Sequence, residues 1–137
     1  VRMERHCANA LAVAKWLESD PRVSWVSFPG LETDKYHTLA EKYMPNGTCG
    51  VISFGVPGGR EKVSAFLDHL KMVSIATHVA DARSCTLYPA GTTHRQLTEE
   101  QLEEAGVGID LVRLSCGIEN ADDIIADLDQ ALTAVQE

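Results

Sequence analysis

Leu111-Val112-Arg113-Leu114-Ser115-Cys116 is a stretch in which every second side chain is apolar and suited to a core. Because side chains alternate between the two faces of a β-strand, the even-numbered residues would line the buried face. Arg113 would then lie on the opposite face, between other residues of the strand. The stretch, extended to residue 118, therefore predicts a strand with one face against a hydrophobic core.

Helical and strand-like segments alternate along the chain before and after this strand. Predicted helices cover about residues 1–19, 34–44, 59–70, 98–105 and 120–135. Predicted strands cover about residues 23–28, 50–56, 72–76, 84–88 and 111–118. Several connections are too short for right-handed parallel crossovers, which favours an antiparallel pairing. We therefore expect one α/β (α+β) sandwich domain over residues 1–137, with a mostly antiparallel sheet of four or five strands and helices mainly on one face.

The spacing of apolar residues and the capping residues define the predicted helices more closely. The first helix has an apolar face made of Met3, Cys7, Ala10, Leu11, Ala14 and Leu17. The second has an apolar face made of Tyr36, Leu39, Ala40 and Tyr43. Thr98 and Gln101 have capping-box spacing, Gly106 is a candidate C-terminal cap, and Asn120 is a candidate N-cap. These signals place the helix ends of the C-terminal half.

Composition excludes several classes of function. The content is 45% hydrophobic and 23% charged, as in ordinary globular proteins, and the net charge of −8 argues against a nucleic-acid partner. No apolar run approaches the roughly 20 residues that span a bilayer, so no membrane association is expected. Residues 1–6 lack the hydrophobic segment of a signal peptide, which predicts a cytoplasmic protein, and the helix already under way there suggests truncation.

The cysteines and histidines do not suggest a metal site. Four cysteines lie far apart with no C-x-x-C spacing, so we expect reduced thiols, with Cys7 and Cys116 acting as small core residues. The five histidines have no metal-ligand spacing either. No bound metal is therefore predicted.

Arg113 is the candidate functional residue that the pattern itself identifies. It is the single basic residue of segment 98–137, which holds eleven acidic residues. An arginine between apolar residues in a strand is costly unless its charge is paired or reaches solvent. Two interpretations remain open at this level: an internal salt bridge to a nearby acid, or bidentate binding of a carboxylate or phosphate.

Five motifs, in order and at fitting spacings, make the whole chain resemble a known family. The motifs are RMERHCANA (2–10), FPGL (28–31), DARS (81–84), PAGTTH (89–94) and VRLSCGIE (112–119). Together they resemble the C-terminal region of the Cys/Met-metabolism PLP-dependent enzymes, which are fold-type I enzymes that use pyridoxal phosphate (PLP). Within that family the likeness is greatest to the O-acetylhomoserine sulfhydrylases (aminocarboxypropyltransferases).

The resemblance implies a substrate-binding role for three residues. Arg113 matches the arginine that binds the substrate α-carboxylate, and Thr93 matches a threonine that helps to bind it. His78 occupies the position of a third contact, where the family has Ser or Asn in an S-L-G-D or N-V-G-D motif. The sequence here is His78-Val79-Ala80-Asp81, so histidine replaces the usual contact residue and Ala80 replaces a glycine.

The resemblance also implies what the chain lacks. In the family the cofactor-bearing lysine and the phosphate-binding residues lie in a large upstream domain, and no lysine here has a matching context. We therefore expect no catalytic or cofactor-binding residue in this chain, no PLP bound to it, and no activity of the isolated fragment. The full-length enzyme would combine this domain with its own N-terminal PLP domain, as a homo-oligomer (tetramer).

The implied reaction is replacement of the acetate of O-acetylhomoserine by sulfide or a thiol, giving homocysteine or methionine. Two other functions remain alternatives. One is a cystathionine γ-synthase or γ-lyase of the same family. The other is a stand-alone small-ligand-binding or oligomerisation module.

Overall fold

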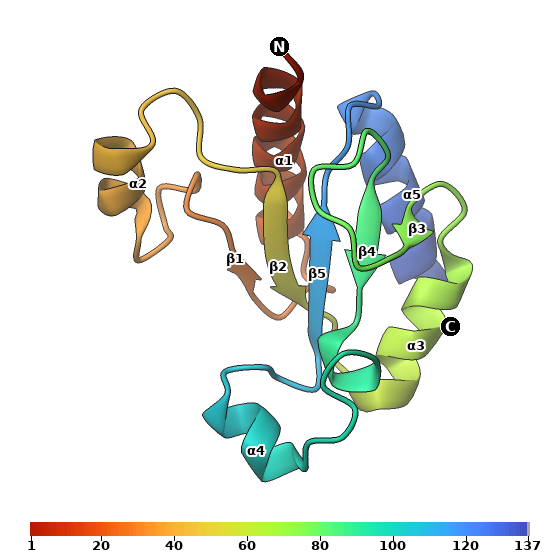
Figure 1. Ribbon diagram of the computed structural model, residues 1–137. Helices are drawn as coiled ribbons and strands as arrows, with labels where there is room; N and C mark the ends of the chain where they lie inside the picture. The colour runs from red at the N-terminus through yellow and green to blue at the C-terminus, as the bar shows by residue number, and fades with distance from the viewer. Residues whose placement is uncertain (137) are drawn as a thin grey trace.

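Helices α1, α3 and α5 cover one face of a five-stranded sheet in the computed structural model, which describes residues 1–136 (Figure 1). The helices are α1 (Arg2–Ser19), α2 (His37–Tyr43), α3 (Gly59–His69), η1 (Pro89–Gly91, a 3-10 turn), α4 (Glu99–Glu104) and α5 (Ala121–Ala134). The strands are β1 (Val26–Ser27), β2 (Val51–Gly55), β3 (Ser74–Ile75), β4 (Cys85–Leu87) and β5 (Leu111–Ser115). The predicted fold class and order of elements are confirmed.

The strand order is β1-β2-β5-β4-β3, so β5 is the central strand. The pairs β1–β2, β2–β5 and β5–β4 are antiparallel, whereas the pair β3–β4 is parallel. In this register Arg113 lies between Ser53 of β2 and Leu87 of β4. The sheet is therefore mostly antiparallel, as predicted, and Arg113 occupies its middle.

The core lies between the sheet and its covering helices. Val112, Leu114 and Cys116 are fully buried, which confirms the buried face predicted for β5. Phe54 of β2 and Phe66 of α3 pack edge to face with ring centroids 6.1 Å apart. Aromatic pairs of this geometry add about 0.5–1.5 kcal/mol to the free energy gained by burying their area.

The edge strands are shorter than predicted. Residues 23–28 were expected to form a strand, but β1 contains only Val26–Ser27, and β3 contains only Ser74–Ile75 of the expected 72–76. Both lie at the edges of the sheet, where each is paired on one side only. The alternation of apolar residues predicts which side chains face the core. The number of residues in a strand also depends on how far the neighbouring strand continues beside it.

The buried face of α1 is rotated from the predicted one. Ala10, Ala14 and Leu17 are buried as expected, but Met3 is 47% exposed. His6 and Asn9 are buried instead. Both bind backbone carbonyls after β5, through contacts of His6 Nδ1 with Cys116 O (2.6 Å) and of Asn9 Nδ2 with Gly117 O (3.0 Å). Polar anchoring thus sets the orientation of the first turns of α1.

The apolar face of α2 does not pack into the core. Only Ala40 is buried, whereas Tyr36, Leu39 and Tyr43 are at least half exposed. The helix lies beyond β1, away from the sheet (Figure 1). The amphipathic pattern correctly predicted a helix here but not the surface that its apolar face contacts.

The predicted caps are present. Thr98 and Gln101 form a capping box, and the Asn120 side chain accepts a hydrogen bond from the N–H of Asp122 (3.2 Å). Gly106 ends α4 with a φ of 71°, a conformation that favours glycine.

Among residues 1–136 no helix combines the length and hydropathy that crossing a bilayer requires.

Candidate functional site

Arg113 projects from the middle of β5 on the face of the sheet that α1, α3 and α5 leave open. Its Nη2 donates a hydrogen bond to the carbonyl of Thr77 (3.0 Å). Its Nε is buried and has no hydrogen-bond partner among the described residues. Within residues 1–136 no carboxylate forms an ion pair with it. The internal salt bridge is therefore absent from this part of the chain, and the guanidinium keeps donors for an external anion.

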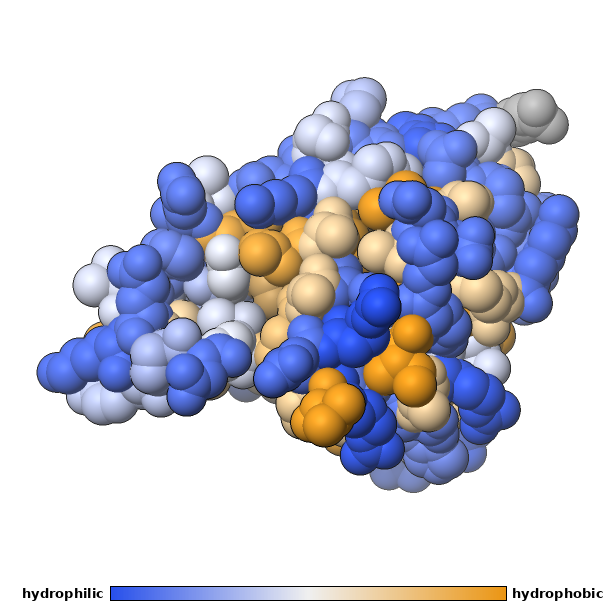
Figure 2. Space-filling model, turned by 90° about the horizontal axis from the view of Figure 1, so that it is seen from above, coloured by the Kyte–Doolittle hydropathy of each residue, from blue (hydrophilic) through white to orange (hydrophobic). Residues whose placement is uncertain are grey.

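The segment between β3 and β4 crosses the open face of the sheet in front of β4 and β5 (Figure 1). The N–H of Ala80 donates to Ser115 Oγ (3.1 Å), and Thr77 accepts from Arg113 as described above. His78 directly follows Thr77, so the structure brings His78 into the neighbourhood of Arg113. Val79 and Ile118 are 55% and 44% exposed. The view of the molecule from above in Figure 2 shows small apolar patches among hydrophilic side chains.

His78 has a charged neighbour of its own. Its Nδ1 lies 3.4 Å from Asp81 Oδ2, and its side chain is 62% exposed. The backbone N–H of Arg83 donates to Asp81 Oδ1 (3.0 Å) and, with the Arg83 and His78 side chains, lowers the pKa of Asp81. The carboxylate thus remains ionised and orients the imidazole from its Nδ1 side.

Thr93 lies on the other side of Arg113. It follows η1, is exposed, and its Oγ1 is 2.9 Å from Nδ1 of His94. Because β4 runs antiparallel to β5, the segment after β4 lies towards the start of β5, whereas His78 lies towards its end. His78 and Thr93 are therefore on opposite sides of Arg113 along the strand, and within the described chain neither is hydrogen-bonded to its guanidinium.

Ala80 has a backbone conformation that favours glycine. Its φ is 56°, in the left-handed region, and it is the one described non-glycine residue with positive φ. This conformation costs a residue with a Cβ roughly 1–2 kcal/mol. The departure that the sequence shows at this position is thus also a source of local strain.

We expect Ala80→Gly to raise the free energy of unfolding by about 0.5 kcal/mol. The relief of strain, about 1–2 kcal/mol, is partly offset by the greater freedom that glycine gives the unfolded chain. Urea titration measures the change. Ala82→Gly, two residues away at an exposed position without positive φ, serves as the matched control and should not stabilise. Equal gains in both variants would contradict the strain at Ala80.

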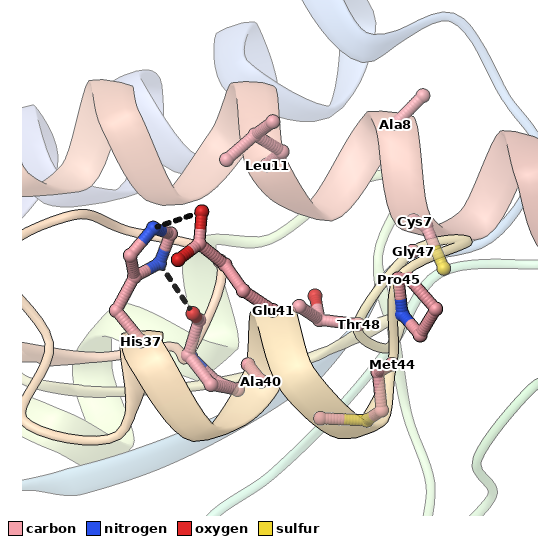
Figure 3. Close-up of a pocket in the computed structure, with 12 residues that line it drawn as sticks. Cys7, Ala8, Leu11, His37, Ala40, Glu41, Met44, Pro45, Gly47 and Thr48 are labelled. Atoms are coloured by element: carbon pink, nitrogen blue, oxygen red, sulfur yellow. Dashed lines mark hydrogen bonds and ion pairs between the residues drawn. The ribbon is translucent and has the colours of Figure 1, made fainter.

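A separate cavity of about 470 Å³ lies between α1 and α2 (Figure 3). Figure 3 shows His37 and Glu41 of α2 facing Leu11 of α1 across it. The polar groups of His37 already have partners, since Nδ1 lies 3.0 Å from Pro29 O and Nε2 lies 3.6 Å from Glu41 Oε1. None of the three predicted site residues lines this cavity, so it is not part of the Arg113 site.

The described residues do not fit a complete PLP site. All five lysines lie on α1, α2 or α3 or next to them, and none lies on the strands of the open face: Lys15, Lys35, Lys42, Lys62 and Lys71. A covalent bond to the cofactor requires a lysine. Within the described residues, the open face therefore offers the guanidinium of Arg113 for an anion but no lysine that would hold the cofactor.

Sequence reasoning missed the polar residues that support this site. Ser84 and Glu119 hold the segment before β4, and His6 and Asn9 of α1 brace the turn after β5. All four lie within motifs that carry the family resemblance. Their occurrence in those motifs was the only signal available, because their contacts join residues 33 to 110 positions apart.

Comparison with known proteins places these features in a family. Residues 1–133 match the family described as "Cys/Met metabolism PLP-dependent enzyme". The chain is 51% identical over 132 residues to homocysteine synthase from Schizosaccharomyces pombe, covering 96% of this chain and 31% of that protein. It is 47% identical over 133 residues to O-acetyl-L-homoserine sulfhydrylase from Leptospira meyeri, covering 96% of this chain and 30% of that protein.

A solved structure agrees with the sequence relatives. A Campylobacter jejuni protein described as an O-acetylhomoserine (thiol)-lyase, solved with N′-pyridoxyl-lysine-5′-monophosphate, superposes with a TM-score of 0.89 at 40% identity. The superposition covers 96% of this chain and 31% of that one. The chain thus spans about a third of the length of the relatives it matches. On the match over residues 1–133 and these identities, the chain belongs to the Cys/Met metabolism PLP-dependent enzyme family.

Proposed function

We propose that this chain is the C-terminal, substrate-carboxylate-binding domain of a PLP-dependent O-acetylhomoserine sulfhydrylase. The reaction would replace the acetate of O-acetylhomoserine by sulfide or a thiol and yield homocysteine or methionine. The names of the relatives from S. pombe and L. meyeri support this choice within the family. The observation that carries the proposal is Arg113, whose guanidinium lies on the open face with no carboxylate partner among residues 1–136.

Arg113 would bind the α-carboxylate through its planar fork. Two parallel N–H···O bonds fix both the position and the plane of a carboxylate, which a single point charge does not do. Within residues 1–136 the guanidinium makes one hydrogen bond, from Nη2 to the carbonyl of Thr77, so its Nη1 group and the second N–H of Nη2 would be left for the two oxygens of a carboxylate. Holding the carboxylate fixes how the rest of the amino acid is presented to the reacting groups.

His78 and Thr93 would contribute from either side of the guanidinium. With Nδ1 directed to Asp81, a neutral His78 has only an acceptor at Nε2. A hydrogen bond from His78 to a substrate carboxylate therefore requires the imidazolium form. Thr93 needs no such change, since its hydroxyl can donate once it turns away from His94.

The proposal also gives the chain a partner. The cofactor and its lysine would come from an N-terminal PLP domain, and the whole enzyme would assemble as a cytoplasmic homo-tetramer. The isolated chain would then bind no cofactor and convert no substrate. This follows from the absence of a lysine on the open face within the described residues.

A domain replacement tests the proposal. In the L. meyeri sulfhydrylase, the segment that matches this chain would be replaced by residues 1–137, with the unmodified enzyme as control. We expect the chimera to make homocysteine from O-acetylhomoserine and sulfide with kcat/KM within about tenfold of the control, which corresponds to about 1.4 kcal/mol. The visible absorbance of bound cofactor reports that the chimera is folded.

Other substrates separate the alternatives within the family. Cysteine would replace sulfide as the better acceptor if the domain belonged to a cystathionine γ-synthase. Cystathionine would be cleaved if it belonged to a γ-lyase. A chimera that binds the cofactor but converts none of these substrates would overturn the proposal.

A further inference from the structure

Glu119, which is half-buried, and Ser84, which is buried, form a polar cluster where the segment before β4 meets the turn after β5. Glu119 Oε1 accepts a hydrogen bond from the N–H of Ser84 (2.6 Å), and Glu119 Oε2 accepts one from Ser84 Oγ (3.0 Å). Ser84 Oγ in turn accepts from the N–H of Gly117 (2.9 Å). Ser84 and the N–H of Gly117 are buried, so loss of the contact between them would leave a polar group that water does not reach. We call these three residues the Ser84–Glu119 clamp.

Beside the clamp, the backbone of the turn after β5 contacts the backbone of the segment before β4. The N–H of Ile118 donates to the carbonyl of Ala82 (2.9 Å). A Cβ added at Gly117 would lie 2.6 Å from the carbonyl carbon of Arg83, so glycine is needed for this approach. The turn after β5 and the segment before β4 are therefore held together by both side-chain and backbone contacts.

The clamp fixes one end of the segment whose other end binds Arg113. From Ser84 the chain runs back to Ala80, whose N–H binds Ser115, and to Thr77, whose carbonyl accepts from Arg113 Nη2. With the Ala82 carbonyl that accepts from Ile118, segment 77–84 is tied to β5 and its following turn at four residues: Thr77, Ala80, Ala82 and Ser84. None of the four ties lies within a helix or strand ladder, so none is supplied by secondary structure alone.

Helix α1 braces the clamp from the opposite face of the sheet. Asn9 Nδ2 donates to the carbonyls of Gly117 (3.0 Å) and Glu119 (2.8 Å). Asn9 is buried, at 2% exposure, so these bonds also have no replacement from solvent. The backbone of Glu119 is fixed by α1 while its carboxylate fixes Ser84.

We infer that Glu119 is a positioning residue for Arg113. Through Ser84 its carboxylate fixes segment 77–84, and the Thr77 carbonyl of that segment holds the guanidinium in one orientation. The inference rests on the proposed function in one respect: the group being positioned is the one assigned to the substrate carboxylate. Glu119 itself touches neither Arg113 nor, in this assignment, the substrate.

The test is the mobility of the Arg113 side chain, measured by ¹⁵N relaxation NMR on the 137-residue chain. In the unmodified chain we expect an order parameter for Arg113 Nε–Hε near the rigid value of about 0.85, and in Glu119→Ala a value below about 0.6. Glu119→Gln should restore rigidity, because an amide oxygen can accept from the N–H of Ser84 and its NH₂ can donate to Ser84 Oγ. If Glu119 contributed only to stability, the order parameter of Arg113 in the folded protein would not fall in Glu119→Ala and recover in Glu119→Gln.

Asp110→Ala is the matched control. Asp110 is also a carboxylate that joins β5 to another segment, since it accepts from Trp25 Nε1 (2.9 Å), but it lies before the strand. Its removal should leave the Arg113 order parameter unchanged. Amide signals of β2 and α3 report in each variant that the fold is intact.

Two results would overturn the inference: a rigid Arg113 in folded Glu119→Ala, or an equal loss of rigidity in Asp110→Ala. If Glu119→Ala is unfolded, Ser84→Ala carries the same test, because it removes only the hydroxyl contacts of the clamp. The order parameter is measured without ligand, so these outcomes do not depend on the substrate. Failure of the proposed function would instead appear as an unchanged KM when Arg113 itself is replaced.

Discussion

Replacing Asp127 with alanine is expected to lower the free energy of unfolding by about 3 kcal/mol. The Asp127 carboxylate, on α5, accepts hydrogen bonds from the N–H groups of Lys71 (2.9 Å), Met72 (2.9 Å) and Val73 (2.8 Å). Asp127 is only 6% exposed, so water cannot replace these acceptors without structural change. Since domains are stable by roughly 5–15 kcal/mol, this loss is a large fraction of the total. Urea unfolding followed by circular dichroism measures it.

Asp129→Ala is the control for this prediction. Asp129 lies two residues further along α5, is half exposed, and pairs with Arg22 at the surface. Exposed pairs of this kind contribute about 0–1 kcal/mol, so the variant should be much less destabilised. Equal losses in the two variants would show that the three N–H contacts of Asp127 do not stabilise the fold as described.

The pH dependence of stability gives a second measurement on the same variant. Burial raises the pKa of Asp127, but the N–H groups of Val73, Lys71 and Met72 lower it by more, so it lies below its ordinary value. A carboxyl whose pKa is lower in the folded state stabilises the fold above its unfolded pKa of about 3.9. That stability is lost as the pH falls through the folded pKa. Asp127→Ala should therefore lose less stability than the unmodified protein on acidification below about pH 4.

Asp127 also shows which part of the fold the sequence could predict. The alternation of segments along the chain predicted the helix that forms α5, because a helix repeats every 3.6 residues and that period is local. The same pattern assigned Asp127 to no particular role, although its carboxylate ends up holding the connection between α3 and β3. Its partners lie 54 to 56 residues away, and no local period reports a contact over that distance.

The candidate site could also be predicted only in part from the sequence. Alternation in β5 predicted the buried row and the opposite placement of Arg113, and both were found. The choice between a salt bridge and a free guanidinium required three-dimensional neighbours, which the structure supplied. The rotated face of α1 was not predicted for the same reason. His6 and Asn9 are polar side chains, and their hydrogen-bond partners in the turn after β5 are far away in the sequence.

Replacing Arg113 with alanine, in the chimera described above, is expected to raise KM for O-acetylhomoserine by about 100-fold, or about 2.7 kcal/mol. The reason is the loss of a charge-assisted, two-pronged contact to the α-carboxylate. Arg113→Lys should recover little of this affinity, because one ammonium group cannot reproduce two parallel bonds in the plane of the carboxylate. Steady-state kinetics at saturating sulfide measure KM, and cofactor absorbance should be the same in all variants.

Arg83→Ala separates a specific contact from a general loss of positive charge. Arg83 lies on the same segment as His78, and its side chain is 66% exposed and forms an ion pair with Asp81. Because exposed charges are screened over about 10 Å at 0.1 M salt, removing it should change KM by less than about twofold. A fall in affinity of similar size in both variants would point to electrostatic attraction over the whole surface. An unchanged KM in Arg113→Ala would remove the carboxylate assignment, because no other cation of the described chain lies in the middle of the open face of the sheet.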